Sequence, residues 1–394
     1  MDSTDRLTLA DLCHELDLPE QFVLDIANGA EDSARYNSYT RSKKSGGKRY
    51  INASTGSLKR LQRRIHDFVL TKYRYPKHVH GGVRGRSVVT NARVHVGKKV
   101  VVNTDLSDFF HSIKTDKVKE IFEKRFRYDE QTSTILSQLT TFRGCLPTGA
   151  PTSSALSNLA ALPLDDAIFD LLDEKIQSTE YGYSRYIDDI TISGDERIIE
   201  ILPEIFKAIE NSGFVCNDKK TRILRRSTRQ WVTGVVVNQK VNPPKKVIRK
   251  VRQAIYYSTK WGLEEHCETH GINPYRFARQ ILGYIAYIRL TRPDLADDFL
   301  NQLQPTLGRF NPPEEYEPDA LEELKRMIDN EELAYFHYEG EDYTVAPATI
   351  VIDDDGTLIM RGFMLAPEQG WEKFRISAIE EITHDIPTQI YEDD

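Results

Sequence analysis

The chain has 394 residues and a formal net charge of −7 at pH 7. That length is enough for two or more domains. It contains no apolar run of about 18 residues, which excludes an ordinary membrane-spanning helix. The N-terminus is polar and acidic, so we expect no signal peptide. The four cysteines are widely spaced and form no Cys-x-x-Cys pair, a pattern typical of reduced thiols in a cytoplasmic protein.

Charge is divided unevenly along the chain. Residues 1–310 hold 48 basic and 37 acidic residues, a net of +11. Residues 311–394 hold 5 basic and 23 acidic residues, a net of −18. The basic part suits a polyanionic partner such as nucleic acid. The acidic part is expected to be a separate unit that binds a protein or the basic surface of the same chain.

The N-terminal part predicts helices around a hairpin. Residues 7–28 predict two short helices that are broken at Leu18-Pro19. Residues 36–52 predict a basic hairpin with Gly46-Gly47 as its turn. A basic amphipathic helix is expected over residues 56–74.

An apolar strand from Lys99 ends on Asp105 and leads into the aromatic pair Phe109-Phe110. A buried carboxylate is costly unless it is paired or bound to a metal, so Asp105 is a candidate ligand. A loop of small residues follows at 144–152. It is either an ordinary approach to a helix or a backbone wall that a nucleotide can approach closely.

A helix is expected from about Thr152 to Leu172. The adjacent acids Asp165-Asp166 lie on it rather than in a turn. We interpret them as a solvent-exposed surface pair.

The segment Tyr186-Ile187-Asp188-Asp189 lies between two short alternating runs, which predicts a strand, a tight turn and a second strand. Taken alone, its two acids indicate either a solvated hairpin or a magnesium site. With Asp105 there are three carboxylates from two strands. This is the ligand set of a two-metal phosphoryl-transfer site, in which the ions lie roughly 3.5–4 Å apart.

The C-terminal half predicts helices and then strands. Residues 245–260 and 271–307 predict helices, and the first of them begins with a basic cluster. Alternating segments at 333–352, 357–365 and 373–376 predict the strands of a small β-barrel, with Asp353–Gly356 as a hairpin turn.

These motifs, in this order, resemble a known family. Asp105 with Phe109-Phe110, the stretch Leu146–Ser153, and Tyr186-x-Asp188-Asp189 look like the palm motifs of reverse transcriptases. Asn91-Ala92-x-x-His95 and Trp231–Asn238 resemble signatures of bacterial retron reverse transcriptases, and the basic segment 43–51 resembles their fingers. The resemblance covers roughly residues 40–305.

The resemblance implies an α+β fold of the right-hand polymerase type, in which the palm has an antiparallel sheet. Residues 1–98 would form N-terminal helices and fingers, 99–238 the palm, and 239–310 a helical thumb. Residues 311–394 would form the acidic C-terminal domain, a small β-barrel-like unit.

The implied activity is RNA-directed DNA synthesis with two Mg²⁺ ions. It would copy a cognate structured non-coding RNA into single-stranded DNA from an RNA 2′-hydroxyl primer. The partners would be that RNA, the RNA–DNA hybrid, deoxynucleotides and an effector protein in anti-phage defence. The alternatives are a reverse transcriptase of another bacterial class, such as a group II intron type, and a non-catalytic RNA-binding scaffold.

The resemblance also assigns residues. Catalysis falls to Asp105, Asp188 and Asp189, and metal binding to these three and Leu106. Nucleotide binding is expected from Lys44, Arg49, Phe110, Thr148, Gly149 and Lys220. RNA binding is expected from Asn91, His95, Lys246, Arg249, Lys250 and Arg252.

Three of these assignments carry their own questions. Phe110 is either a gate that excludes a ribose 2′-hydroxyl or a core aromatic residue. Thr148 stands where many reverse transcriptases have Gln, which reaches farther, and this puts its nucleotide contact in doubt. Asn91 and His95 either pin a loop through backbone hydrogen bonds or contact an RNA sugar-phosphate.

Overall fold

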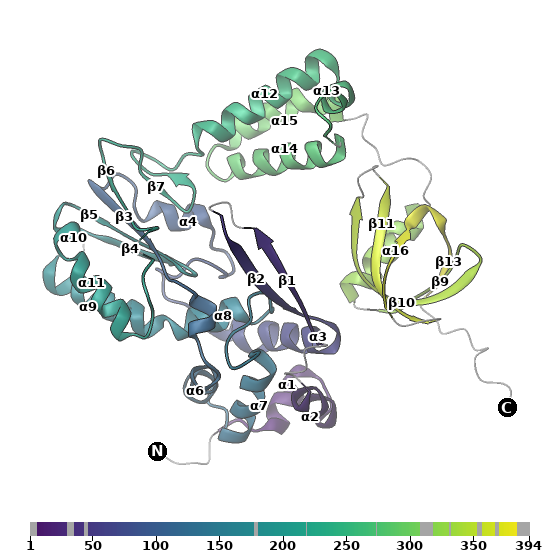
Figure 1. The fold of residues 1–394 in the computed structure, drawn as a ribbon, viewed down its shortest axis with the longest axis horizontal. Coiled ribbons are helices and arrows are strands. Elements are labelled where there is room, and N and C mark those ends of the chain that lie inside the picture. Colours follow the sequence, from purple (N-terminus) through teal and green to yellow (C-terminus); the bar gives the residue numbers. More distant parts are fainter. Residues whose placement is uncertain are drawn as a thin grey trace. The chain divides into compact units, whose positions relative to one another are not determined.

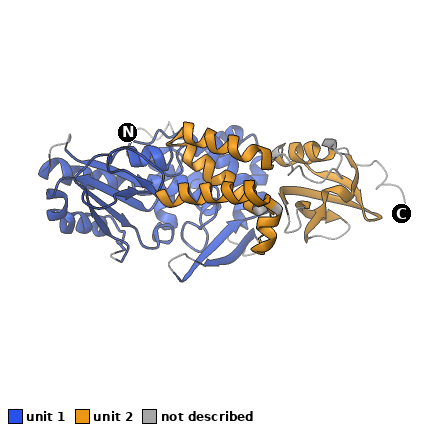
Figure 2. Cartoon of the chain, turned by 90° about the horizontal axis from the view of Figure 1, so that it is seen from above, with its two compact units in different colours: residues 1–244 blue, residues 245–394 orange. Residues whose placement is uncertain are grey.

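The computed structural model describes residues 6–29, 35–42, 46–176, 180–217, 219–272, 274–307, 318–330, 332–352, 357–366 and 370–383. It is a mixed α+β structure that divides into two compact units, Met1–Pro244 and Lys245–Asp394 (Figure 2). The boundary lies close to the predicted end of the palm at residue 238. The second unit contains both the predicted thumb helices and the acidic C-terminal region. None of the described helices is both long enough and apolar enough to cross a membrane.

The first elements of the chain match the predicted helices and hairpin. Helices α1 (Leu9–Leu16) and α2 (Glu20–Asn28) are followed by the antiparallel strands β1 (Tyr36–Ser42) and β2 (Lys48–Ser54). Thr8 caps α1 through reciprocal hydrogen bonds with Asp11. The predicted long helix after the hairpin is α-helical only over α3 (Gly56–Arg64), and it continues as a π-helical turn, Ile65–Val69, and a 3-10 turn, Leu70–Lys72.

A four-stranded antiparallel sheet is the centre of the first unit (Figure 1). Its strand order is β4-β5-β3-β6, in which β3 is Val100–Asp105, β4 is Gly182–Tyr186, β5 is Asp189–Gly194 and β6 is Arg222–Arg225. Five of the six residues of β3 are buried. The predicted apolar strand is therefore an inner strand of the sheet.

Helices pack around this sheet and contribute most of the buried hydrophobic residues of its core. They are α4 (Val88–Arg93), α5 (Phe109–Ser112), α6 (Thr115–Arg125), α7 (Glu130–Thr140), α8 (Ser153–Ala160), α9 (Leu162–Lys175), α10 (Arg197–Glu200) and α11 (Leu202–Asn211). The single helix predicted over 152–172 is two helices, because the chain turns at Ala161 and Pro163 begins the next first turn.

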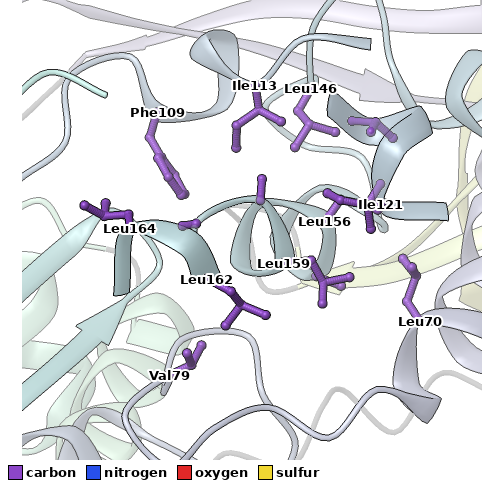
Figure 3. Packing of buried hydrophobic residues seen from close by; sticks show 14 of the residues in the cluster. Leu70, Val79, Phe109, Ile113, Ile121, Leu146, Leu156, Leu159, Leu162 and Leu164 are labelled. Carbon is purple, nitrogen blue, oxygen red and sulfur yellow. The ribbon is translucent and has the colours of Figure 1, made fainter. Parts of the chain in front are cut away.

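Helix α8 is the most enclosed of these helices. Leu156 and Leu159 on α8 belong to one buried cluster with Phe109, Ile113 and Leu146 (Figure 3). The small hairpin of β7 (Trp231–Val232) and β8 (Val235–Val236) completes the unit.

Among its described residues, the second unit holds two larger hydrophobic clusters and a small third one of Leu263, Cys267 and Ala278. One of the larger clusters lies among α12 (Lys245–Trp261), α14 (Pro274–Arg289) and α15 (Pro293–Leu307), with α13 (Leu263–Thr269) beside them. The other larger cluster joins Leu324 and Met327 of α16 (Pro318–Asn330) to a five-stranded antiparallel sheet.

That sheet has the order β12-β11-β10-β9-β13. Its strands are β9 (Ala334–Tyr338), β10 (Glu341–Ile352), β11 (Leu358–Ala366), β12 (Gly370–Arg375) and β13 (Ile379–Thr383), with a 3-10 turn at Ile376–Ala378. Among the described residues, this pairing leaves β12 and β13 at the ends of the strand order. The turn predicted at Asp353–Gly356 lies outside the described residues.

Candidate active site

The antiparallel sheet brings three predicted carboxylates to one end. Asp105, the last residue of β3, lies directly opposite Asp189, the first residue of β5. Asp188 lies in the two-residue turn between β4 and β5, and its carbonyl accepts a hydrogen bond from the Leu106 amide at 3.0 Å. The strand, turn and strand predicted for this segment are present, so residues more than 80 positions apart in the sequence meet here.

The turn has an unusual backbone conformation. Ile187, its first central residue, has a φ of +60°, while Asp188 is not among the residues with positive φ. Positive φ at the first position alone is typical of a type II′ turn, where glycine is the usual residue. A β-branched residue in this region is rare and strained, so the surrounding structure must hold it there.

The three acids repel one another in a partly enclosed place. Burial, reinforced by the charges of Asp188 and Asp105, raises the pKa of Asp189 to about 7. Burial and the charge of Asp105 also raise the pKa of Asp188, and the nearby Lys220 and Arg49 oppose that shift. A carboxylate cluster with raised pKa values in a polar site is typical of a group that binds cations.

Lys220 supplies a cation at this cluster. Its Nζ atom lies 2.8 and 2.7 Å from the two carboxylate oxygens of Asp105. The amide of Asn217, three residues before, donates to the Asp105 carbonyl at 2.8 Å and places the lysine segment beside β3. Lys220, predicted to bind nucleotide, is therefore next to the predicted catalytic acid.

The donors present are of the kind that magnesium prefers, namely carboxylate oxygens. Within the described parts of the chain, no three His, Cys, Asp or Glu side chains are already arranged as a metal site. In this structure the ammonium group of Lys220 contacts both carboxylate oxygens of Asp105. The residues fit magnesium, provided that Lys220 releases Asp105.

The small-residue loop lies against the basic hairpin. The Asn52 amide donates to the Thr148 carbonyl at 2.9 Å. Gly149 has a φ of +125°, and a Cβ atom there would lie 3.0 Å from the Ile51 side chain. A larger residue at 149 would push the hairpin away. This contact explains why Arg49, which is on the same strand, acts on Asp188.

Of two other residues predicted to contact the nucleotide, the structure describes Phe110 but not Lys44. Phe110 is half-buried and packs edge-on against Phe109, with ring centroids 5.7 Å apart. It therefore has both a packed side and an accessible one. Lys44 lies outside the described residues.

A family model of the reverse transcriptase (RNA-dependent DNA polymerase) matches residues 41–247, more than half of the chain and all of this site. The retron Ec86 reverse transcriptase of Escherichia coli is 32% identical over 232 residues, which cover 57% of this chain and 70% of that protein. The chain belongs to the retron reverse transcriptases.

Relatives from Myxococcus xanthus agree with this assignment. The retron Mx162 reverse transcriptase is 33% identical over 69% of this chain, and the retron Mx65 enzyme is 30% identical over 68%. The chain spans 61% and 64% of the length of these two relatives. Among solved structures, apo telomerase from Candida tropicalis aligns at 9% identity with a TM-score of 0.42, covering 74% of this chain and 59% of that one. A score this low supports no conclusion.

The two retron-like signatures meet in space. Asn91 on α4 donates to the Thr233 hydroxyl at 3.3 Å, and that hydroxyl donates to the Val88 carbonyl at 3.2 Å. The imidazole of His95 lies between two hydroxyls, those of Ser193 on β5 and Ser184 on β4, each at 2.7 Å. Asn91 and His95 are both fully buried. Of the two alternatives, the structure favours pinning, although the partners are side chains rather than backbone groups.

The predicted RNA-binding residues of the second unit lie on α12, as expected from the sequence. Lys246, Arg249, Lys250 and Arg252 are all exposed. Lys250 donates to the side chains of Gln280 and Tyr284 at 3.1 Å each, and Arg252 lies over the Phe299 ring. These contacts orient two of the four cations, and RNA binding by the helix stays a prediction.

One interpretation from the sequence is wrong. Asp165 is not on the surface but fully buried, and it forms an ion pair with the buried Arg185, whereas Asp166 is exposed. The sequence spacing indicates that Asp165 could be buried, because it falls on the same helical face as Ile168 and Leu172. The sequence analysis assigns no role to Arg185, which lies on β4 directly before Tyr186 and is the one charged residue of that strand.

Proposed function

We propose that this chain is an RNA-directed DNA polymerase that copies part of a cognate structured RNA into single-stranded DNA. The observation that carries the proposal is the meeting of Asp105, Asp188 and Asp189 at the end of the central sheet. Membership of the retron reverse transcriptases supports the choice of RNA as template and of an RNA 2′-hydroxyl as primer. It also supports a role in defence against phage, together with an effector protein.

In this proposal the first unit contains the fingers and palm, and helices α12–α15 are the thumb. Arg49 on the hairpin β1–β2 would supply a positive charge that suits a nucleotide triphosphate, which is supported by its opposing effect on the pKa of Asp188. The backbone at Thr148–Gly149 offers a surface that a base and sugar can approach, and Phe110 lies under the sugar. The exposed cations of α12 contact the phosphates of an RNA–DNA hybrid.

Asp105, Asp188 and Asp189 would hold two magnesium ions, with Leu106 adjoining them. When bound, the ions would lower the pKa of the attacking hydroxyl and stabilise charge on the leaving pyrophosphate. Lys220 holds the Asp105 carboxylate in place until then through contacts with both of its oxygens, and it is afterwards available to the triphosphate.

The test is replacement of Asp188 by Asn, which keeps the shape of the side chain but removes its charge. DNA synthesis on the cognate RNA should be abolished, while RNA affinity and the unfolding temperature stay close to those of the parent. Asp166→Asn is the matched control, because Asp166 is exposed on α9. Magnesium-dependent extension by Asp188→Asn at a rate near that of the parent would contradict the proposed site.

The ion pair between Lys220 and Asp105 also gives a specific reason to consider a non-catalytic scaffold. A protein that binds its RNA but in which Lys220 never releases Asp105 would make no DNA. Parent protein that co-purifies with RNA carrying no attached DNA, and that extends no primer at any magnesium concentration, would favour that function.

A further inference from the structure

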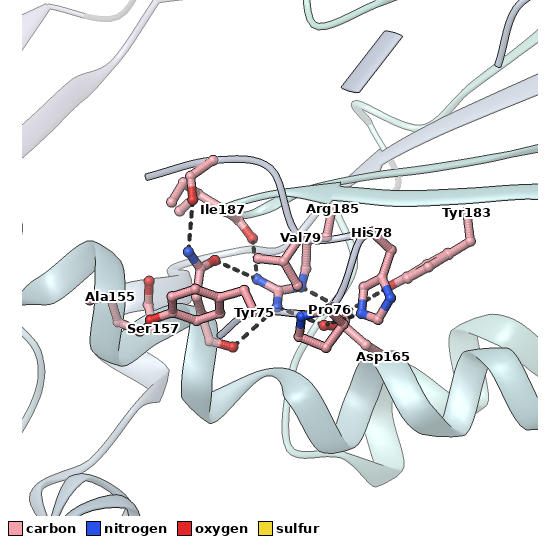
Figure 4. Close-up of polar contacts among 12 residues, drawn as sticks. Tyr75, Pro76, His78, Val79, Ala155, Ser157, Asp165, Tyr183, Arg185 and Ile187 are labelled. Atoms are coloured by element: carbon pink, nitrogen blue, oxygen red, sulfur yellow. Dashed lines mark hydrogen bonds and ion pairs between the residues drawn. The ribbon is translucent and has the colours of Figure 1, made fainter. Parts of the chain in front are cut away.

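The buried guanidinium group of Arg185 contacts the turn Ile187–Asp188. Arg185 is the residue before Tyr186, and its side chain is fully buried. Nε and Nη2 donate to the two carboxylate oxygens of Asp165 at 2.8 and 2.7 Å. Nη1 donates to the Asn158 side-chain oxygen at 2.9 Å and to the Ile187 carbonyl at 3.1 Å (Figure 4). One rigid group therefore joins α8, α9 and the turn.

Asp165, the charged partner of Arg185, has further contacts of its own. Asp165 accepts a further hydrogen bond from the Tyr183 hydroxyl at 2.6 Å, and the Nε2 atom of His78 lies 3.3 Å away. Burial alone would raise the pKa of Asp165, but the charge of Arg185 and the hydrogen bonds from Arg185, His78 and Tyr183 together outweigh it, and the pKa is lowered. Arg185 and Asp165 therefore form an ionised pair. Its two parallel hydrogen bonds fix the orientation of the guanidinium plane as well as its distance from the carboxylate.

The other side of the turn is closed by backbone. Asn158 donates to the Gly81 carbonyl at 2.7 Å. A Cβ atom on Gly81 would lie 2.7 Å from the backbone nitrogen of Ile187, so any larger residue would force the turn to shift. The Arg185 amide donates to the His78 carbonyl at 2.9 Å and the His80 amide donates to the Arg185 carbonyl at 2.8 Å, which keeps this segment beside β4.

These contacts act on one peptide plane. The Ile187 carbonyl belongs to the peptide that links Ile187 to Asp188, and this peptide directly follows the strained positive φ of Ile187. Strain of this kind persists only where the surrounding structure over-determines it. The hydrogen bond from Arg185 and the packing of Gly81 supply that constraint from two sides.

We infer that Arg185, together with Asp165, Asn158 and Gly81, positions Asp188 for metal binding by holding the Ile187–Asp188 peptide in its strained orientation. The inference rests on the proposed function, since Asp188 has to be a metal ligand for its orientation to matter. Asp165, Asn158 and Arg185 are positioning residues, because they touch neither substrate nor metal.

The alternative is that the network only stabilises the core. Gly81→Ala separates the two roles, because it removes no buried charge or hydrogen bond. Gly81 is outside the left-handed region, so alanine can adopt its backbone conformation, yet the added methyl group presses on Ile187. Gly370→Ala is the control, since a Cβ atom there meets nothing within 4 Å.

Arg185→Lys gives an independent test. Lysine keeps the charge beside Asp165, but a single ammonium group cannot also reproduce the fork that reaches the Ile187 carbonyl. Arg197→Lys is its control, because Arg197 forms an exposed ion pair with Asp195.

Two measurements on the full chain decide between the roles. Mn²⁺ binding by the protein alone, followed by electron paramagnetic resonance, reports the metal site without any turnover. Steady-state extension at varied Mg²⁺ then gives kcat, the KM for deoxynucleotide and the Mg²⁺ concentration at half-maximal rate. Groups that orient a metal ligand typically change metal affinity by roughly 10–100-fold when replaced.

We expect Gly81→Ala and Arg185→Lys to weaken Mn²⁺ binding about 10-fold and to raise the half-maximal Mg²⁺ concentration similarly. The KM for deoxynucleotide at saturating Mg²⁺ and the affinity for RNA should stay within about twofold of the parent, as should every property of the two controls. Unchanged Mn²⁺ affinity in Gly81→Ala would overturn the inference. So would a loss of metal binding that is matched by loss of folded protein. If Asp188→Asn itself leaves Mn²⁺ binding intact, the proposed function fails instead.

Discussion

Acidification should destabilise the first unit through His95. This imidazole is fully buried between Ser193 and Ser184, and burial lowers its pKa from 6.5 to about 3. The neutral ring donates from one nitrogen and accepts at the other, which suits two hydroxyl partners. A protonated ring would place an uncompensated charge in the core.

The sign and size of the effect follow from linkage. The folded pKa lies below the unfolded value, so below pH 6.5 the unfolded chain binds the proton and the folded chain does not. The stability present above pH 6.5 is therefore lost as the pH falls toward 3. Each pH unit is equivalent to about 1.4 kcal/mol, so between pH 7.5 and pH 5 the loss from His95 is about 2 kcal/mol.

The assay can follow the first unit alone. The chain has three tryptophans, and Trp231 is the one within residues 1–244. With Trp261 and Trp371 replaced by Phe, urea unfolding monitored by fluorescence reports that unit. His95→Gln keeps a donor and an acceptor but does not titrate. Its unfolding free energy should fall by about 2 kcal/mol less than that of the parent between pH 7.5 and pH 5.

Equal pH dependence in the two proteins would refute this reasoning, as would an imidazole pKa near 6.5 measured by NMR in the folded protein. The experiment also tests the two roles considered for His95. If the residue is structural, His95→Gln at pH 7.5 binds RNA as the parent does. Weaker RNA binding with an unchanged unfolding free energy would show instead that His95 contacts RNA.

Two further predictions concern the sugar gate and the acidic region. Phe110→Ala should admit ribonucleotides more readily with a modest loss of deoxynucleotide use. An unchanged ratio of ribonucleotide to deoxynucleotide incorporation would show that Phe110 is only a core residue. Deletion of residues 311–394, which carry a net charge of −18, should spare DNA synthesis but lose an effector in a pull-down. Stronger nonspecific nucleic-acid binding without loss of a partner would show that the region shields the basic part. A truncated protein that can neither fold nor make DNA would show that residues 311–394 are an integral part of the polymerase domain.

Local features of the site could be predicted from the sequence, because they depend on neighbouring residues. The alternation around Tyr186–Asp189 predicts two strands and a turn, and both strands are present. The apolar run before Asp105 predicts a strand that ends on the acid, as observed. Side chains alternate along a strand and cluster on a helix face with known periods, so short windows carry this information.

The roles of buried polar residues were decided only by the tertiary structure. Asp165 was interpreted as a surface acid because its partner, Arg185, is 20 positions away in the sequence and on another element. Asn91 and His95 leave two roles open in the sequence, and their buried contacts with Thr233, Ser184 and Ser193 favour the structural role. The ion pair of Lys220 with Asp105 spans 115 positions. A buried polar group is tolerated only where the fold brings a hydrogen-bonding or charged partner to it, and no local pattern specifies that partner.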